Sequence, residues 1–349
     1  MHRLLLPTLC LGFLLQANAQ IKDTVTVIGV GDIMMGSNYP DNSGLPPNDG
    51  QSLFKEVEEV LKSADVTMGN LEGVLLDQGG TPKTCRDPKV CYVFRSPEHY
   101  TQNLVAAGFD VMSLANNHAG DFGEAGRRSS MAALDKAGIN HAGQVTKPYT
   151  LFDKDGIKYG FAAFAPNGGC VNINDLKRAK EIVAHLDSLA DIVIISFHGG
   201  AEGPQHQHVS KSNELFHGEN RGNVYLFAHT VIDAGADIVF GHGPHVVRGV
   251  EVYKDRFVAY SLGNFCTYGG INVAGINGYA PIIKVYTDTK GVFFKGQITS
   301  GIQSFRAPVS IDSQKQAIRK IRELTKDDFN DPALSIDDNG WIKKSTIQR

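Results

Sequence analysis

Side chains that commonly bind metal ions occur in five clusters along the chain, and each cluster follows a short apolar segment. The residues concerned are Asp32, Glu72, Asn117, His118, His198, His242 and His245. Imidazole mixed with carboxylate donors suits zinc, manganese or iron, whereas calcium and magnesium prefer shells made only of oxygen. These residue types therefore predict a divalent metal site.

Each cluster follows a segment that is typical of a buried β-strand. The five segments are nearly continuous runs of apolar, often β-branched residues at 25–30, 64–68, 109–114, 190–195 and 236–240. Such runs are characteristic of sheets covered by helices on both faces. Because ligands gather at the carboxyl ends of the strands in such sheets, the five clusters are expected to form one site.

Amphipathic segments alternate with these strands. Their periodicity predicts helices at 51–62, 96–108, 124–136, 174–190 and 224–234. Ser96 is expected to cap the second helix, with Pro97 at its first position. Asp155-Gly156 predicts a hairpin within 149–164. Further strands are expected at 250–253, 257–262, 282–286 and 292–298, and a short helix at 317–324. This order predicts an α/β core with an added β-sheet and no separable domains.

Polar residues next to the clusters are candidates for substrate binding. Asn70 lies two residues before Glu72, so in an extended strand both side chains face the same side of the sheet. The full set of candidates is Asn70, Asn116, Glu202 and Asn264. Asp121 is close enough to His118 to hold the imidazole in one tautomer, as carboxylates beside metal sites do. Asn and Asp also begin ordinary turns, so a structural role for each stays open.

His242 and His245 flank Gly243-Pro244, so two imidazoles belong to one short turn. They can supply one ligand to each of two metals, or both ligands to one metal. Gly31, directly before Asp32, allows another backbone segment to approach closely. The residues alone leave the number of metals open at one or two.

The first residues are typical of a secretory signal peptide. His2-Arg3 precedes an apolar stretch at 4–15, and Ala17-Asn18-Ala19 is a small-residue cleavage site. The stretch is too short to span a bilayer, and no later run is long and apolar enough. Cys10 makes lipidation an alternative, but Leu9 before it is a poor match. Cleavage near Ala19 predicts an exported protein, either periplasmic or extracellular.

Removing residues 1–19 leaves 33 basic and 37 acidic residues. This balance argues against nucleic acid and anionic membranes as partners. An anionic substrate would have to be held by metal ions or by local backbone donors. The oligomeric state stays open.

Four cysteines remain in the exported chain. Cys85 and Cys91 lie six residues apart in a loop, so a disulfide is expected in an oxidising compartment, with free thiols or a metal pair as alternatives. Cys170 and Cys266 each follow a strand-end segment, and their spacing leaves open whether they pair.

With these clusters assembled, the chain resembles the CapA/PgsA family of capsule or poly-γ-glutamate synthesis proteins, which are related to calcineurin-like metallophosphoesterases. The motifs are GDIMMG from Gly31, GNLEG from Gly69, SLANNHAGDFGEAG from Ser113, SFHGGAE from Ser196, GADIVFGHGPH from Gly235 and AYSLGNF from Ala259. The resemblance implies a four-layered α/β/β/α sandwich with mixed sheets and a metal centre at the strand ends. This domain is expected at 20–310, followed by a C-terminal helix and polar tail at 311–349.

The resemblance also implies roles for individual residues. The implied metal ligands are Asp32, Glu72, Asn117, His198, His242 and His245. Glu72 stands in the place of a bridging aspartate. His118 resembles a catalytic histidine that protonates a leaving oxygen, and Asp121 is grouped with it as catalytic.

Two positions depart from the related patterns. Metallophosphoesterases have a histidine two residues after the first aspartate, where this chain has Met34. Many CapA members have a histidine at the position of Gly243. Two possible donors are therefore missing.

Two hypotheses follow. The first is an exported metal-dependent hydrolase that acts on a phosphoester or amide in a capsule or cell-wall polymer, or on a small phosphorylated or peptide substrate. It would use one or two ions of manganese, zinc or iron. The second is a non-catalytic accessory that binds or exports an anionic polymer during capsule or poly-γ-glutamate synthesis.

Overall fold

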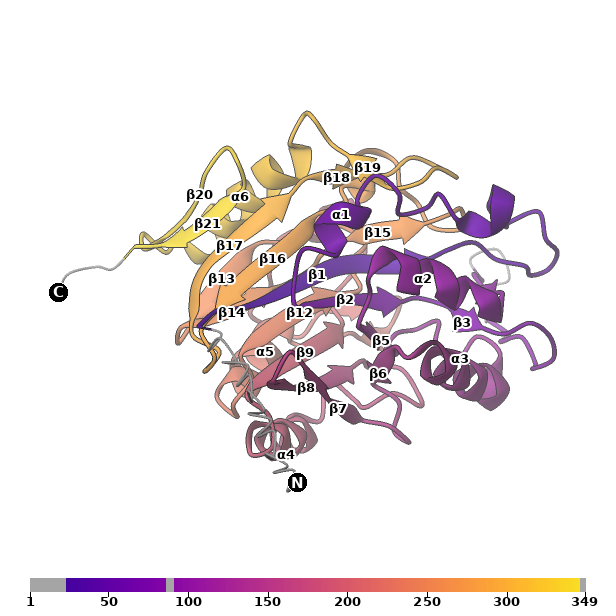
Figure 1. Ribbon diagram of the computed structural model, residues 1–349, viewed down its shortest axis with the longest axis horizontal. Coiled ribbons are helices and arrows are strands. Elements are labelled where there is room, and N and C mark those ends of the chain that lie inside the picture. Colours follow the sequence, from indigo (N-terminus) through magenta and orange to yellow (C-terminus); the bar gives the residue numbers. More distant parts are fainter. Residues whose placement is uncertain (1–22, 86–90, 346–349) are drawn as a thin grey trace, which may run out of the picture.

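Two β-sheets form the centre of the molecule, and helices cover their outer faces (Figure 1). The computed structural model describes residues 23–85 and 91–345. The signal peptide expected at 1–19, including Cys10, lies outside the described residues.

The larger sheet contains nine strands: β1 (Val25–Met34), β2 (Val66–Leu71), β5 (Val111–Ser113), β6 (Asn140–Ala142), β15 (Asn264–Thr267), β16 (Ile282–Thr287), β17 (Phe293–Thr299), β20 (Leu334–Ile336) and β21 (Trp341–Lys344). Their order is β20-β21-β17-β16-β1-β2-β5-β6, and β15 pairs with β1 off this path. The four strands from β1 to β6 run parallel, whereas β16, β17, β21 and β20 pair antiparallel.

The smaller sheet contains six strands: β7 (Tyr149–Lys154), β8 (Ile157–Phe164), β9 (Ile192–His198), β12 (Ile238–His242), β13 (Val250–Tyr253) and β14 (Arg256–Ala259). Their order is β13-β14-β12-β9-β8-β7, with four parallel strands in the middle and an antiparallel strand at each edge. Both sheets are therefore mixed, as the family resemblance implies.

Six α-helices are found in the described residues: α1 (Glu58–Leu61), α2 (Thr101–Ala107), α3 (Gly123–Ala137), α4 (Leu176–Asp187), α5 (Val224–Ile232) and α6 (Gln316–Phe329). The first three pack on the outer face of the larger sheet, and α4 and α5 pack on the smaller one. Short 3-10 helices span Pro47–Gly50, Glu98–Tyr100, Pro204–His206 and Gly275–Gly278. Three small ribbons pair β3 (Val74–Leu75) with β4 (Arg95–Ser96), β10 (Leu215–Phe216) with β11 (Glu219–Asn220), and β18 (Gly301–Ile302) with β19 (Ser310–Ile311).

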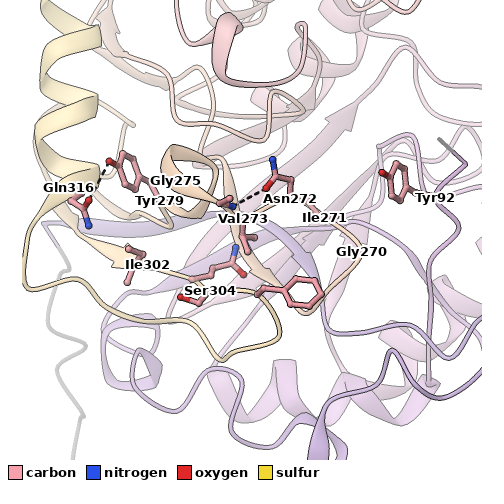
Figure 2. Close-up of a pocket in the computed structure, with 13 residues that line it drawn as sticks. Tyr92, Gly270, Ile271, Asn272, Val273, Gly275, Tyr279, Ile302, Ser304 and Gln316 are labelled. Carbon is pink, nitrogen blue, oxygen red and sulfur yellow. Dashed lines mark hydrogen bonds between the residues drawn. The ribbon is translucent and has the colours of Figure 1, made fainter. Parts of the chain in front are cut away.

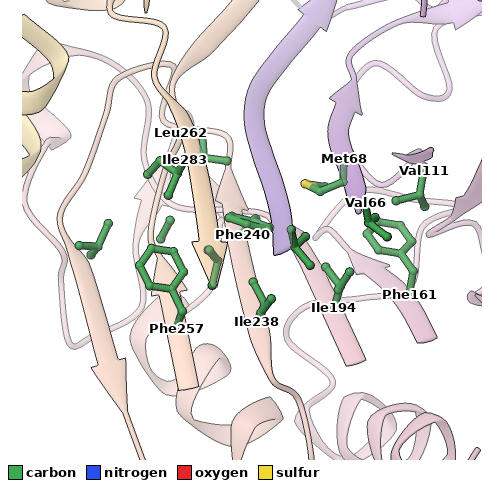
Figure 3. Close-up of a cluster of buried hydrophobic side chains, with 14 of the residues drawn as sticks. Val66, Met68, Val111, Phe161, Ile194, Ile238, Phe240, Phe257, Leu262 and Ile283 are labelled. Atoms are coloured by element: carbon green, nitrogen blue, oxygen red, sulfur yellow. The ribbon is translucent and has the colours of Figure 1, made fainter. Parts of the chain in front are cut away.

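The main hydrophobic core lies between the two sheets. Figure 3 shows Val66 and Met68 from the larger sheet beside Phe161, Ile194 and Phe240 from the smaller one. Full burial of each such side chain contributes roughly 1.5–3 kcal/mol. Separate cores lie between each sheet and its helices. This arrangement confirms the expected four-layered α/β/β/α sandwich.

Two local predictions were wrong. Within 51–62 only α1 is α-helical, and the preceding residues form tight turns in which Leu53 N–H bonds Gly50 O and Val57 N–H bonds Phe54 O. The apolar period of that segment reflects burial of Leu53, Phe54 and Val57. Ser96 does not cap the next helix, because its hydroxyl donates to Gly36 O at 2.6 Å.

Other sequence expectations are met more closely. Helices α3, α4 and α5 lie within the expected segments or extend them by one residue, and β7 and β8 form the expected hairpin. In the segment expected as a C-terminal helix and polar tail, β20 and β21 extend the larger sheet beyond α6. No helix among the described residues is long and apolar enough to cross a membrane.

The predicted disulfide between Cys85 and Cys91 is present, with their Cα atoms 5.5 Å apart. Cys170 and Cys266 are buried free thiols. The open question of their pairing is therefore answered: they do not form a disulfide.

Candidate metal centre

Strand register brings the predicted clusters to one edge of the two sheets. In the larger sheet Asp32 of β1 lies beside Asn70 of β2, and Glu72 follows directly after that strand. In the smaller sheet His242 of β12 lies beside His198 of β9. Parallel strands end at a common edge, so the polar ends of both sheets meet across the inter-sheet core.

The backbone of Gly263 packs closely against Gly31 and Asp32 at this edge. The N–H of Asp32 donates to Gly263 O at 2.9 Å. A Cβ atom on Gly31 would lie 2.1 Å from that same oxygen. Only glycine therefore fits at position 31, beside the backbone of Gly263.

The centre is a compact set of carboxylates and imidazoles. Asp32 lies 3.2 Å from His242 Nδ1 and 3.0 Å from His245 Nδ1. One oxygen of Glu72 lies 3.4 Å from His198 Nε2 and 3.5 Å from His245 Nε2. Ligand atoms of Asp32, Glu72 and His245 all lie within 4.8 Å of one another, which is a spacing that one ion could bridge.

Several polar atoms of this set are buried without hydrogen-bond partners among the described residues. They are both carboxylate oxygens of Glu72, both ring nitrogens of His198 and of His242, and the side-chain oxygen of Asn117. A buried polar atom without a partner normally costs about 1–3 kcal/mol. Coordination to a cation satisfies such atoms, and the donor types match zinc, manganese or iron. The residues therefore fit a bound divalent metal.

The charges of the site are strongly perturbed by burial and by each other. Burial and the nearby Asp32 charge raise the pKa of Glu72 to about 7. Burial acts to raise the pKa of Asp32, but the neighbouring imidazoles of His242 and His245 outweigh it and hold the value well below the usual range. Burial and the Arg221 charge hold the pKa of His198 well below its usual value, so this imidazole is neutral and available as a ligand.

His245 has the opposite electrostatic environment. Burial favours its neutral form, but the carboxylates of Glu72 and Asp32 outweigh burial and raise its pKa to about 10. The position therefore favours positive charge. A field that attracts a proton here also attracts a metal cation.

Two side-chain amides connect Asp32 to the backbone of His118 along the edge of the larger sheet. Asn70 donates to Asp32 Oδ1 at 2.9 Å and accepts from Asn116 at 2.9 Å. Asn116 in turn accepts from the N–H of His118 at 3.0 Å. These contacts make Asn70 and Asn116 orienting groups for the centre, and their contact with substrate stays a prediction.

Asn264 is likewise engaged with protein groups. Its amide N–H groups are directed to the backbone oxygens of His245, Asn272 and Asn277 at 3.0–3.3 Å. Its Oδ1 lies 3.0 Å from His245 Nδ1. The side chain thus orients His245, and its predicted contact with substrate stays a prediction.

His118 lies beside the centre with Asp121 as its partner. Its Nδ1 is 2.8 Å from Asp121 Oδ2, as the sequence led us to expect. The ring of Phe94 packs against that of His118 in a tilted arrangement, with centroids 4.4 Å apart. Lys83 Nζ lies 2.5 Å from the other oxygen of Asp121. Sequence reasoning missed Lys83 and Phe94, although the paired cysteines nearby in the same loop were a usable signal.

A buried arginine was also missed. Arg221 is 2% exposed, and its guanidinium lies 2.9 Å from Glu202. It also donates to Gly200 O at 3.2 Å, which ties it to the loop after His198. Glu202 is therefore paired inside the protein, and its role in substrate binding stays a prediction.

The two departures from the related patterns have a structural basis. Met34 is buried, and its sulfur accepts from the N–H of Gly36 at 3.3 Å. Gly243 has φ of +112°, and a Cβ there would lie 2.8 Å from the backbone of Gly199. This turn therefore has no room for a histidine at position 243.

A cavity of about 740 Å³ lies near the centre, and none of the predicted site residues lines it (Figure 2). Its wall includes Asn272, whose backbone oxygen accepts from Asn264. Exposed Phe305 and Tyr92 also line it, and no charged residue does. Asn272 therefore connects the cavity wall to Asn264, the residue that orients His245.

Comparisons with known proteins identify the family of this chain. Residues 26–268 match the family described as "Bacterial capsule synthesis protein PGA_cap". The chain is 26% identical to "Capsule biosynthesis protein CapA" of Bacillus anthracis, over 88% of this chain and 74% of that one. It is 27% identical to "PGA biosynthesis protein CapA" of Bacillus subtilis, over 87% and 79%. Among solved structures, a hypothetical protein from Thermus thermophilus aligns with a TM-score of 0.49 at 16% identity, over 80% of this chain and all of that one. Because the family match covers more than half of its length, the chain belongs to the bacterial capsule synthesis protein family PGA_cap.

Proposed function

We propose that this protein is an exported metal-dependent hydrolase that cleaves a phosphoester or amide in a capsule or cell-wall polymer. One observation carries the proposal. Imidazoles and carboxylates from both sheets are buried together with unsatisfied ligand atoms, and His118 lies beside them with its own carboxylate partner. Stability alone does not account for so many unpaired polar atoms in a core.

The metal would be held by residues from both sheets, namely Asp32, Glu72, Asn117, His198, His242 and His245. When bound there, a divalent cation would act as a Lewis acid and would lower the pKa of its bound water molecule to near neutrality. Asp32 and Glu72 provide the negative charge that such a cation requires. The number of ions is one or two in this proposal.

His118 would deliver a proton to the leaving oxygen or nitrogen. Its Nδ1 faces Asp121 at 2.8 Å, which leaves Nε2 as the atom that can serve substrate. Asp121 fixes the ring, as a carboxylate does for a histidine in catalysis. The side chain of His118 is 8% exposed, so a proton moved here is largely protected from bulk water.

The substrate in this proposal is an anionic polymer, or a small phosphorylated or peptide fragment of one. The relatives from Bacillus carry names of capsule and PGA biosynthesis proteins. The chain as a whole is acidic, so attraction of an anion has to come from the metal and from local cations. Lys83, 28% exposed at the rim of the centre, is one such cation.

We place the remote part of a longer substrate in the cavity lined by Phe305. Phe305→Ala should raise KM for a polymeric substrate and leave KM for a minimal one unchanged. Phe294→Ala, which removes an exposed aromatic ring on β17, serves as the control. Equal KM values for all three proteins would exclude this placement.

Export is part of the proposal because a disulfide between Cys85 and Cys91 persists in oxidising compartments. The expected signal peptide precedes the described residues. Fractionation of cells that produce the full chain would test this, and an unprocessed form found only in the cytoplasm would argue against it.

The deciding experiment combines elemental analysis with a metal-supplemented screen of phosphoester and γ-glutamyl amide substrates. We expect turnover that His118→Ala lowers by roughly 10²–10⁴-fold while metal content is unchanged. His208→Ala, at an exposed site paired with Asp328, should keep full turnover. Wild-type turnover in His118→Ala would refute the role of His118.

One observation favours a second candidate, a polymer-binding accessory without catalysis. Met34 occupies the position of a histidine ligand in the related hydrolases, and its buried sulfur is engaged with Gly36. Metal-dependent retention of an anionic polymer, with no cleavage of any substrate in the screen, would favour this candidate over the hydrolase.

A further inference from the structure

The two segments that flank the Cys85–Cys91 disulfide both contact the His118–Asp121 pair. Lys83 lies two residues before Cys85, and Phe94 lies three residues after Cys91. We propose that Lys83 and Phe94 are positioning residues for His118 and that the disulfide holds them together. The proposal builds on the role given to His118 in the proposed function, but its test does not measure hydrolysis.

Lys83 binds Asp121 at two points. Its ammonium lies 2.5 Å from Asp121 Oδ1, and its backbone N–H donates to Asp121 O at 2.7 Å. The ammonium is also 3.4 Å from His118 Nδ1 and 3.5 Å from the backbone oxygen of Asn117. Lys83 therefore lies against both members of the pair and against the backbone of a candidate metal ligand.

Phe94 approaches the same pair from the other end of the loop. Its N–H donates to Asp121 Oδ2 at 2.7 Å, the same oxygen that faces His118 Nδ1. Its ring is tilted by 34° against the imidazole at a centroid distance of 4.4 Å. The carboxylate and the imidazole are thus both fixed by one residue.

The burial of Asp121 separates this arrangement from an ordinary surface ion pair. The Asp121 side chain is fully buried, whereas Lys83 is 28% exposed. A buried carboxylate that loses one charged partner is left uncompensated, which is far more costly than the loss of an exposed pair. Lys83 is therefore the cationic partner that compensates the buried carboxylate of Asp121 and orients it.

The disulfide supplies the connection between the two ends. Phe94 is anchored because the next residue begins β4, which pairs with β3. Lys83 belongs to no helix or strand, so its place depends on Asp121 and on Cys85, two residues away. A covalent link from Cys85 to the anchored side of the loop reduces the conformational freedom of Lys83.

The test is the side-chain NMR spectrum of His118 in the full chain labelled with 15N-histidine, with EDTA present. The close contact with the Phe94 ring gives the ring protons of His118 a ring-current shift, and His118→Gln identifies these signals. We expect Lys83→Met to lose at least half of that shift or to show two sets of signals. Lys83→Arg, which restores a charged donor, should return the signals toward their wild-type positions.

The chain offers a matched control for the lysine. Lys147 lies 3.1 Å from Asp135 and 3.0 Å from His141, in a second Lys–Asp–His arrangement away from the metal ligands. Lys147→Met should leave the His118 signals unchanged. Wild-type His118 signals in Lys83→Met would overturn the role of Lys83.

The disulfide is tested in the same spectrum. C85S/C91S, and wild-type protein treated with a reductant, should both move the His118 signals as Lys83→Met does, with cooperative thermal unfolding retained. The other two cysteines of the described chain are buried free thiols, so reduction acts on this pair. Unchanged His118 signals in both samples would overturn the role of the disulfide. A failed substrate screen would refute only the proposed hydrolase.

Discussion

The imidazole of His245 lies 3.0 Å from the carboxylate of Asp32, although 213 residues separate them in sequence. The same ring nitrogen, Nδ1, also lies 3.0 Å from Asn264 Oδ1. Asn264 directs its N–H groups to backbone carbonyls, so both neighbours of Nδ1 are hydrogen-bond acceptors. The network therefore assigns a proton to Nδ1 and leaves Nε2, which faces Glu72, for a metal.

Removing the amide that orients His245 should weaken metal binding. Asn264→Ala deletes one of the two acceptors beside Nδ1, and loss of such an orienting partner lowers metal affinity roughly 10–100-fold. Competition against a metal-binding dye measures the change. Asn272→Ala is the matched control, since that side chain is exposed and, within the described residues, hydrogen-bonds the N–H of Ala274 and no metal ligand. Equal affinity in wild type and Asn264→Ala would contradict the assigned orientation.

Metal binding should stabilise the fold through Glu72. A ligand that binds only the folded state adds about 2.7 kcal/mol to the free energy of unfolding at 100 times its Kd. Glu72→Gln keeps the shape of the side chain and removes the charge, so most of this increment should be lost. Denaturant unfolding with EDTA and with added manganese measures it.

Glu251→Gln serves as the control for that measurement. Glu251 is a partly buried glutamate on β13 whose partners are His229 and Tyr260, away from the metal ligands. This variant should keep the full stabilisation by metal. An undiminished increment in Glu72→Gln would remove Glu72 from the ligand set.

Much of the site was predictable because its residues end apolar strands. Buried parallel strands have a simple sequence pattern, and their carboxyl ends share one edge, so Asp32, His198 and His242 could be assigned to one site before the fold was known. The register then confirmed the neighbours, with His242 beside His198. Site residues that directly follow buried strands are predictable whenever the apolar sequence pattern reveals the order of those strands.

Lys83, Phe94 and Arg221 were not predictable in the same way. They lie in loops, where no periodicity indicates which side chain points inward. Their contacts depend on tertiary folding, such as the 27-residue separation between Phe94 and Asp121. The segment 51–57 shows the opposite error. Its apolar residues recur with a helical period because they are buried, but the backbone there forms turns and not an α-helix.

Packing between the sheets should couple Gly29 to Phe240. A Cβ on Gly29 would lie 2.5 Å from two ring carbons of Phe240, across the interface between β1 and β12. Overpacking of this kind typically costs about 1–3 kcal/mol, so Gly29→Ala should lower the free energy of unfolding by that order. Gly168→Ala is the control, since a Cβ there meets no atom within 4 Å.

Combining two substitutions tests that contact directly. Phe240→Leu removes the ring and leaves a void, which should destabilise the protein by itself. In Gly29→Ala/Phe240→Leu the new methyl group occupies part of that space, so the loss should be smaller than the sum of the single losses. A coupling of about 0.5–3 kcal/mol is typical for residues in contact. Strict additivity in denaturant unfolding would show that the two positions do not contact each other.

Away from the metal ligands, His141 should make stability depend on pH. Burial, together with the nearby charge of Lys147, lowers the pKa of His141 below its usual value of 6.5. The folded state therefore favours the neutral ring. The contribution of His141 to stability is complete above pH 6.5 and is lost as the pH falls toward the lowered folded value, because the unfolded chain takes up a proton first.

Replacing His141 should flatten this dependence. One proton taken up on unfolding gives a slope of at most about 1.4 kcal/mol per pH unit. His141→Gln should therefore show a smaller loss of unfolding free energy between neutral pH and pH 5 than wild type, whatever its stability at neutral pH. His185→Gln, at an exposed position on α4, should keep the wild-type slope. If His141→Gln instead keeps the full slope, buried histidines elsewhere in the chain account for it, and His141 takes up its proton equally in the folded and unfolded states.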